Sequence, residues 1–166
     1  LDRRIDPDQE IRLRARQVPI GELIKQIAQQ CGGETALVGN VVYVGPPATA
    51  EKLRTLAAVR SDEAQKLPDD VRRLVLAREP FGWPELTQPR DLLAQLAAEA
   101  RMTVSDPKLV PHDLWPSASL PPMCWTDRLT LVLAQFDLTF SIQGGVLQWT
   151  PIPSTVQLTR SYPGGK

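Results

Sequence analysis

One stretch of the sequence occurs twice, and this repeat constrains the fold more than any other feature. Residues 18–47 align with residues 124–153. The matched pairs in the first half of each copy are Leu23 with Leu129, Ile27 with Leu133, Ala28 with Ala134 and Gln29 with Gln135. After a one-residue gap, the glycine turn at 39–41 aligns with the one at 144–146. Both copies therefore predict a helix followed by a two-stranded hairpin, one supersecondary unit used twice.

The first copy predicts a small unit that begins before its helix. Apolar and basic residues alternate in the order Ile11, Arg12, Leu13, Arg14, Ala15 and Arg16. This period of two predicts a strand that buries its apolar face and exposes its arginines. Apolar residues spaced three or four apart over 20–31 predict an amphipathic helix, and Gly39-Asn40 predicts a hairpin turn. We expect β-α-β-β over 10–45, within a unit spanning 1–47.

Residues 48–80 predict a helical connector. A helix is expected over 49–67, ending before Pro68. Residues 69–80 leave two alternatives open, because Val71, Leu74 and Val75 suit a helix whereas Leu74–Leu76 also suits a short strand. The connector either joins two separate units or packs on both of them.

Residues 81–153 predict a second α+β unit. In chain order we expect an extended segment at 82–84, a helix opened by Pro89, a short strand at 102–104, a loop from Pro107, an extended stretch at 117–123, a helix from Thr126 and strands at 138–142 and 146–150. The fold class is therefore α+β, with small sheets and packed helices in repeated βαβ-type units. Residues 154–166 predict a last strand, Val156–Tyr162, leading to a region further downstream.

Charge and hydropathy exclude two classes of protein. Lys and Arg number 19, as do Asp and Glu, so the formal charge is zero. A nucleic-acid-binding protein normally has a basic excess, which argues against such a partner. No apolar run approaches the roughly 20 residues that span a bilayer. Because the chain starts at Leu1 without a leader of basic and apolar residues, we expect either a trimmed piece or a processed fragment of a longer protein.

Two stretches of the second unit have a recognisable pattern: Leu92–Ala97, in the helix opened by Pro89, and Leu129–Thr150, a helix with a closing hairpin. Together they resemble a known family, the secretin and TonB short N-terminal (STN) domain. Leu92–Ala97 is similar to the family's first helix, of the "aLaqLA" kind, and Leu129–Thr150 is similar to its second helix and closing hairpin. Residues 10–45 look like a second, partial copy of the closing part. The connector at 48–80 and the Trp- and Pro-rich loop at 107–125 depart from the usual compact domain.

The resemblance implies an architecture and a location rather than a reaction. STN-like domains carry no catalytic residues and no cofactor, and in secretins and TonB-dependent receptors they contact partner proteins or neighbouring subunits in the periplasm. The resemblance therefore implies a non-enzymatic interaction or assembly module of an exported bacterial envelope protein, located in the periplasm or cell envelope after removal of a signal peptide. Its expected partners are envelope proteins or further copies of itself.

Residues with reactive side chains are few and lack the neighbours that chemistry requires. His112 is the single histidine, so a Cys/His metal site is not expected. A surface loop is the simpler interpretation, and a catalytic His112 completed by sequence outside the chain is the alternative. Cys31 and Cys124 are too few for a disulfide scaffold. Cys31 lies on the apolar stripe of its helix, so burial is expected, with a bridge to Cys124 as the alternative.

Two groups of residues are candidates for partner binding. The first is Arg12, Arg14 and Arg16, which form either a solvated edge that discourages aggregation or a contact for an acidic partner. The second group consists of the tryptophans Trp83, Trp115, Trp125 and Trp149. Tryptophan is common in cores, in interface hot spots and in sugar-binding platforms. Trp115 and Trp125, in the proline-rich loop, give the alternative function, a module that binds cell-wall polysaccharide.

Overall fold

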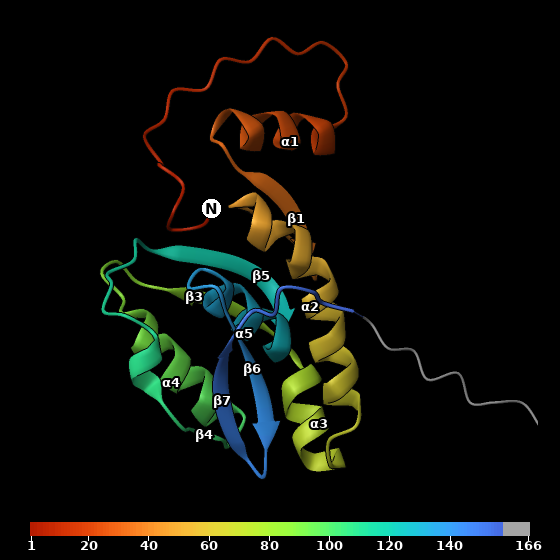
Figure 1. The fold of residues 1–166 in the computed structure, drawn as a ribbon, viewed down its shortest axis with the longest axis vertical. Helices are drawn as coiled ribbons and strands as arrows, with labels where there is room; N and C mark the ends of the chain where they lie inside the picture. The colour runs from red at the N-terminus through yellow and green to blue at the C-terminus, as the bar shows by residue number, and fades with distance from the viewer. Residues whose placement is uncertain (158–166) are drawn as a thin grey trace, which may run out of the picture.

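The computed structural model describes residues 1–157. It is an α+β fold, as predicted, with five α-helices, one short 3-10 helix and three small sheets among these residues. Figure 1 shows α1 and the preceding loop at one end of the molecule, joined to the body through β1 and the start of α2. No helix of the described part is both long and apolar enough to cross a bilayer.

The first helix and hairpin form where the sequence predicts them. Helix α1 (Ile20–Gln30) is followed by β1 (Glu34–Val38) and β2 (Val41–Gly45), which pair in antiparallel register with Val38 opposite Val41. Gly39 has a φ of 58°, which an L side chain adopts at a cost. The two-residue turn predicted from Gly39-Asn40 is therefore confirmed.

The strand predicted over 11–16 is wrong. Residues 7–19 run as an irregular segment, and five of the six residues from 11 to 16 are exposed. The physical reason is that a strand needs a neighbour. Sheet β1–β2 has two strands, and no part of 7–19 pairs with either of them. Alternation of apolar and basic residues is a local property and cannot supply that neighbour.

The connector folds as two helices. Helix α2 (Pro47–Gln65) begins two residues earlier than predicted, and α3 (Asp69–Leu76) follows Pro68. Of the two alternatives for 69–80, the helix is found for Val71 to Leu76, while β3 (Arg78–Trp83) follows at once. Helix α2 packs on both β1 and α5 (Figure 1).

The remaining elements surround one buried helix. Helix α4 (Pro89–Glu99), β4 (Thr103–Val104) and the 3-10 helix η1 (Pro107–Leu109) precede β5 (Ala118–Cys124), which pairs with β3. In α5 (Trp125–Ala134) every residue except Asp127 is buried. Strands β6 (Leu138–Gln143) and β7 (Val146–Pro151) form an antiparallel hairpin, and β4 joins β7 in parallel.

Two apolar clusters hold the fold together. The larger one gathers α4, α5 and the β4–β7–β6 sheet around side chains such as Leu96, Leu129 and Phe140. The smaller one brings Val38 of β1, Leu53 and Leu56 of α2, and Leu131 of α5 into contact. The first hairpin, the connector and the second unit thus share this smaller core.

The chain after β7 is described for a short stretch. Ile152 and Val156 pack against the smaller cluster, and residues 152–157 have no strand. The rest of the strand predicted at Val156–Tyr162 lies outside the described residues.

Candidate functional site

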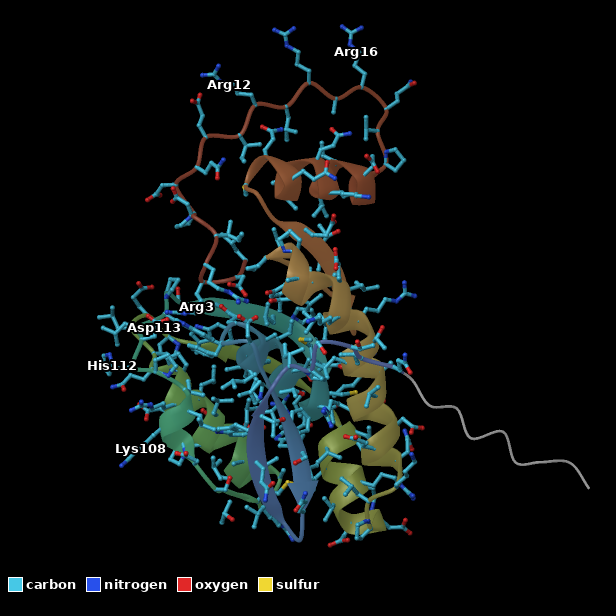
Figure 2. All side chains as sticks on the ribbon, viewed as in Figure 1. Arg3, Arg12, Arg16, Lys108, His112 and Asp113 are labelled. Carbon is cyan, nitrogen blue, oxygen red and sulfur yellow. The ribbon has the colours of Figure 1, made fainter. Side chains whose placement is uncertain are left out.

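The arginines predicted to bind a partner lie together at one end of the molecule. Arg12, Arg14 and Arg16 are all exposed, in the irregular segment that leads into α1. Figure 2 shows Arg12 and Arg16 pointing away from the rest of the molecule. We name residues 10–16 the arginine segment.

The side chains of the arginine segment are almost free of intramolecular partners. Arg12 Nη2 lies 3.2 Å from Glu10 Oε2, and the two side chains are 84% and 77% exposed. An ion pair this exposed contributes little, because water screens the charges and both side chains lose freedom. Arg14 and Arg16 form no ion pair with any described residue. All three guanidinium groups are thus available to a partner.

The Gln30 side chain connects the arginine segment to α1 by hydrogen bonds. Gln30 ends α1, and its side-chain Oε1 accepts the Arg12 amide at 3.0 Å while its Nε2 donates to the Arg12 carbonyl at 3.1 Å. Gln9 Nε2 donates to the Gln30 carbonyl at 2.6 Å. The Gln30 amide thus contacts Arg12 through both backbone groups, as a neighbouring strand would.

The apolar side of the arginine segment is not buried. Ile11 is partly covered, Ala15 is exposed and Leu13 is 38% exposed. Ile20, at the start of α1, is 71% exposed. Apolar and basic side chains therefore share one accessible surface at this end.

The structure places Trp125 away from any partner. Its side chain is 1% exposed, its Nε1 donates to the Leu96 carbonyl at 2.6 Å, and its ring meets Phe140 edge-on at 5.7 Å. In this fold Trp125 is a core residue at the start of α5. It presents no ring to a glycan or to a protein surface.

Trp115 is also covered, in a row of aromatic rings. It is 4% exposed and stacks on Phe136 at 5.8 Å with an interplanar angle of 6°. Trp83 lies 5.6 Å from Trp115 and Phe81 lies 5.3 Å from Trp83, so the row continues along β3. The Arg3 guanidinium caps its other end, 5.0 Å from the Phe136 ring. The row packs the proline-rich loop onto the core.

His112 lies in the exposed loop between η1 and β5 (Figure 2). The neighbouring Asp113 is engaged elsewhere, since it accepts hydrogen bonds from Arg3 Nε at 2.6 Å and Trp115 Nε1 at 3.0 Å. Burial acts to raise the pKa of Asp113, but these hydrogen bonds outweigh it, and the pKa lies below its ordinary value. The structure therefore does not bring Asp113 and His112 together as an acid–base pair.

The two cysteines are free thiols, and both are half-buried. Cys124 Sγ lies 3.4 Å from the Leu76 carbonyl, where the thiol can donate a weak hydrogen bond. The bridge between Cys31 and Cys124 that the sequence left open is not formed in this structure. Within residues 1–157, no three His, Cys, Asp or Glu side chains are grouped so that they could hold a metal ion.

A polar cluster that the sequence did not point to joins the N-terminal residues to three elements. Arg4 pairs with Asp2 through Nε at 2.8 Å and Nη2 at 3.0 Å, and with Asp137 through Nη1 at 2.6 Å. Tyr43 of β2 donates to Asp2, and Thr49 of α2 donates to Asp137 at 2.6 Å. We call these five residues the N-terminal clasp.

The pKa values of Arg4 and Tyr43 are raised within the N-terminal clasp, which favours the protonated side chains that donate its hydrogen bonds. The hydrogen bond to Asp2 raises the pKa of Arg4 above its ordinary value. Burial, followed by the contact with Asp2, raises the pKa of the Tyr43 hydroxyl. Charged Arg4 and neutral Tyr43 are thus both held at neutral pH. Asp2 and Arg4 are two positions apart, but the other hydrogen bonds given above for the clasp join residues 41 or more positions apart, so no periodic pattern or motif marks these residues.

Comparison of the chain with protein-family models, with curated proteins and with solved structures finds no significant match.

Proposed function

We propose that the chain is a non-catalytic interaction module that binds another protein by strand addition through its arginine segment. The observation that supports this most directly is a mismatch between sequence and fold. Residues 11–16 have the alternation of a strand with one buried face, yet none of them pairs with a strand in the described part of the chain. A partner's sheet edge would provide the missing neighbour.

The backbone of the segment has the hydrogen-bonding groups that strand addition uses. From Leu13 to Arg16, no backbone N–H or C=O group is bonded to another group within residues 1–157. In strand addition the main chain supplies the affinity and alternate side chains supply the specificity. A partner strand can therefore pair with residues 13–16 without breaking a hydrogen bond of the fold, whereas the backbone of Arg12 is already bonded to Gln30.

The side chains define the expected partner. Leu13 and Ile11 would pack on the partner's apolar sheet face, and the arginines would lie on the opposite side of the new strand. Three guanidinium groups on one side fit an edge that carries Asp or Glu side chains. The partner is therefore expected to be a protein with an acidic sheet edge.

The resemblance to STN domains supports a location for this function. We infer that the chain belongs to an exported bacterial envelope protein and acts in the periplasm or cell envelope, on protein partners or on further copies of itself. The proposed internal repeat fits the same picture. Elements α1–β1–β2 and α5–β6–β7 are each a helix followed by a hairpin closed by a two-residue turn. Polysaccharide binding has no comparable support, because Trp115 and Trp125 are covered.

The experiment combines partner capture with hydrogen exchange. The tagged protein is incubated with an envelope extract, captured partners are identified, and amide exchange of residues 10–16 is measured in the purified complex. We expect slowed exchange at alternate amides of the segment, because one side of the added strand faces the partner. Protection spread elsewhere, with residues 10–16 unchanged, would contradict strand addition.

Two sets of variants separate the contribution of backbone hydrogen bonds to partner binding from the contribution of the arginine charges. Leu13→Pro and Arg14→Pro each remove one backbone N–H group. Adjacent N–H groups of a strand point to opposite edges, so one of these two groups would be bonded to the partner strand. At least one of the two proline variants should abolish partner capture, while the folded body is unaffected.

The charge variant replaces Arg12, Arg14 and Arg16 together by Gln. Its matched control replaces Arg54, Arg73 and Arg101 by Gln, because these three arginines are also exposed. Equal capture by the two triple variants would rule out the arginines as the contact.

A further inference from the structure

A second surface feature, distant from the arginine segment, has the form of a small-molecule site. A cavity of about 290 Å³ lies between α4 and the chain from β4 to η1. Apolar side chains form most of its wall, among them Leu93, Ala97, Met102, Val104, Pro107 and Trp149. The volume is at the lower end of the range for ligand pockets, which begins at roughly 300 Å³.

The cavity exists because α4 turns alanines toward it. Ala94, Ala97 and Ala98 are spaced three and four residues apart, so they share one face of the helix. Side chains with a single carbon leave space that leucines would fill. Ala97 is buried at the inner end, whereas Ala94 and Ala98 are exposed at the mouth. Trp149, which is 5% exposed, contributes to the wall from β7.

The wall favours an apolar occupant over water. Water against these apolar side chains has few polar partners, so an apolar group that displaces it is favoured by the burial of apolar surface. A cavity of about 150 Å³ holds benzene, so 290 Å³ has room for a longer body, such as a chain of about eight carbons.

One charged side chain lines this apolar space. Arg90, in the first turn of α4, donates from Nε to the Val110 carbonyl, which fixes its guanidinium beside the cavity. Its two terminal nitrogens have no partner within residues 1–157, and no acidic residue lines the cavity. A guanidinium held in this way is suited to pair with a carboxylate through two parallel hydrogen bonds.

We propose that this cavity binds a medium-chain monocarboxylate, with its carbon chain against Trp149 and the alanine face of α4 and its carboxylate on Arg90. This site is independent of the arginine segment, which lies at the far end of the molecule (Figure 1). Charge complementarity selects the head group, and the cavity volume limits the chain.

The test uses octanoate and octan-1-ol as probes, with binding measured by titration calorimetry and located by amide chemical shifts. The native protein should bind octanoate at least tenfold more tightly than octan-1-ol, with shifts centred on residues 90–104 and 149. Arg90→Met should remove most of this preference, and Arg90→Lys should restore part of it. If Arg90→Met leaves the ratio of the two affinities unchanged, the carboxylate contact is refuted.

A second pair of variants tests the location without touching Arg90. Ala98→Leu narrows the mouth from an exposed helix position and should weaken both probes by tenfold or more. Gln95→Leu adds the same side chain at an exposed position of α4 that does not line the cavity, and should leave both affinities unchanged. Native-like octanoate binding by Ala98→Leu would overturn the proposal, and a circular dichroism spectrum confirms that each variant is folded.

Discussion

Arg4 donates hydrogen bonds to both carboxylate oxygens of Asp2, from Nε to Oδ1 and from Nη2 to Oδ2. The Asp2 side chain is fully buried, and the Arg4 side chain is 26% exposed. The pair sits where the N-terminal residues meet β2, α2 and the end of α5. Removing one member of a buried pair is costly, because the other charge is left without compensation.

Replacing Arg4 by Met is therefore expected to lower the free energy of unfolding by about 3 kcal/mol. Urea denaturation at neutral pH measures the change. The double variant Asp2→Asn/Arg4→Met should lose less than the sum of the two single variants, because the two residues share one interaction. Additive losses would show that the pair does not act as a unit.

The lowered pKa of Asp137 predicts how the stability of the fold changes at acid pH. Burial acts to raise its pKa, but hydrogen bonds from Arg4 and Thr49 and the charge of Arg4 outweigh it, so the pKa lies below the ordinary value. The folded state therefore favours the ionised carboxylate. This contribution is complete above about pH 4, the ordinary range of Asp, and is lost as the pH falls through the lower, folded-state pKa.

We expect the free energy of unfolding to fall in this acid range, and less steeply in the Asp137→Asn variant. The difference between the native protein and the variant should shrink as the pH is lowered, because protonated Asp137 no longer attracts Arg4. Denaturation curves between pH 6 and pH 2 provide the measurement. A difference that stays constant with pH would contradict the role given to the ionised carboxylate.

The two hairpin turns offer a matched pair of glycines. Gly39 and Gly144 have φ values of 58° and 57°. A Cβ on Gly144 meets nothing within 4 Å, whereas one on Gly39 would lie 2.7 Å from Asp127 Oδ2. Gly144→Ala is expected to cost about 1 kcal/mol of folding free energy for its backbone conformation alone, and Gly39→Ala to cost more.

Thermal and urea denaturation of both glycine variants measure the difference. Adding Asp127→Ala to Gly39→Ala should recover the excess cost, because it removes the carboxylate that the new methyl group meets. Equal losses in the two single variants would show that Asp127 moves aside freely.

Trp125 and Trp83 test the distinction between core and surface tryptophans. Each donates a hydrogen bond from Nε1 to a carbonyl, Trp125 to Leu96 and Trp83 to Pro116. Trp125 is fully buried and Trp83 is half-buried. Trp125→Phe should lower the free energy of unfolding by about 2 kcal/mol, from a lost buried hydrogen bond and lost packing.

The matched variant Trp83→Phe should cost less than about 1 kcal/mol, because water can replace its hydrogen bond. Fluorescence offers a second measurement, since Trp125→Phe should remove a blue-shifted component of the emission. A larger loss of stability from Trp83→Phe would mean that the aromatic row contributes more than the core position.

The sequence by itself determined the elements whose cause is local. The spacing of apolar residues that predicts α1 and α5, and the glycines that predict the turns at Gly39 and Gly144, each lie within a segment of 11 residues or fewer. Helix periodicity and positive φ are properties of short segments, so reading the chain in order is enough to place them. The α+β class follows from the order of these elements.

Only the tertiary structure decided which segments pair with, or pack on, segments that are distant in the sequence. The alternation at 11–16 predicts a strand, but pairing depends on a second strand that the fold does not place there. Trp125 is buried because α4 brings the Leu96 carbonyl to its indole, and Arg4 is held by Asp137, 133 residues away. Burial and ion pairing of this kind depend on which distant segments the fold brings together, and no local spacing encodes that.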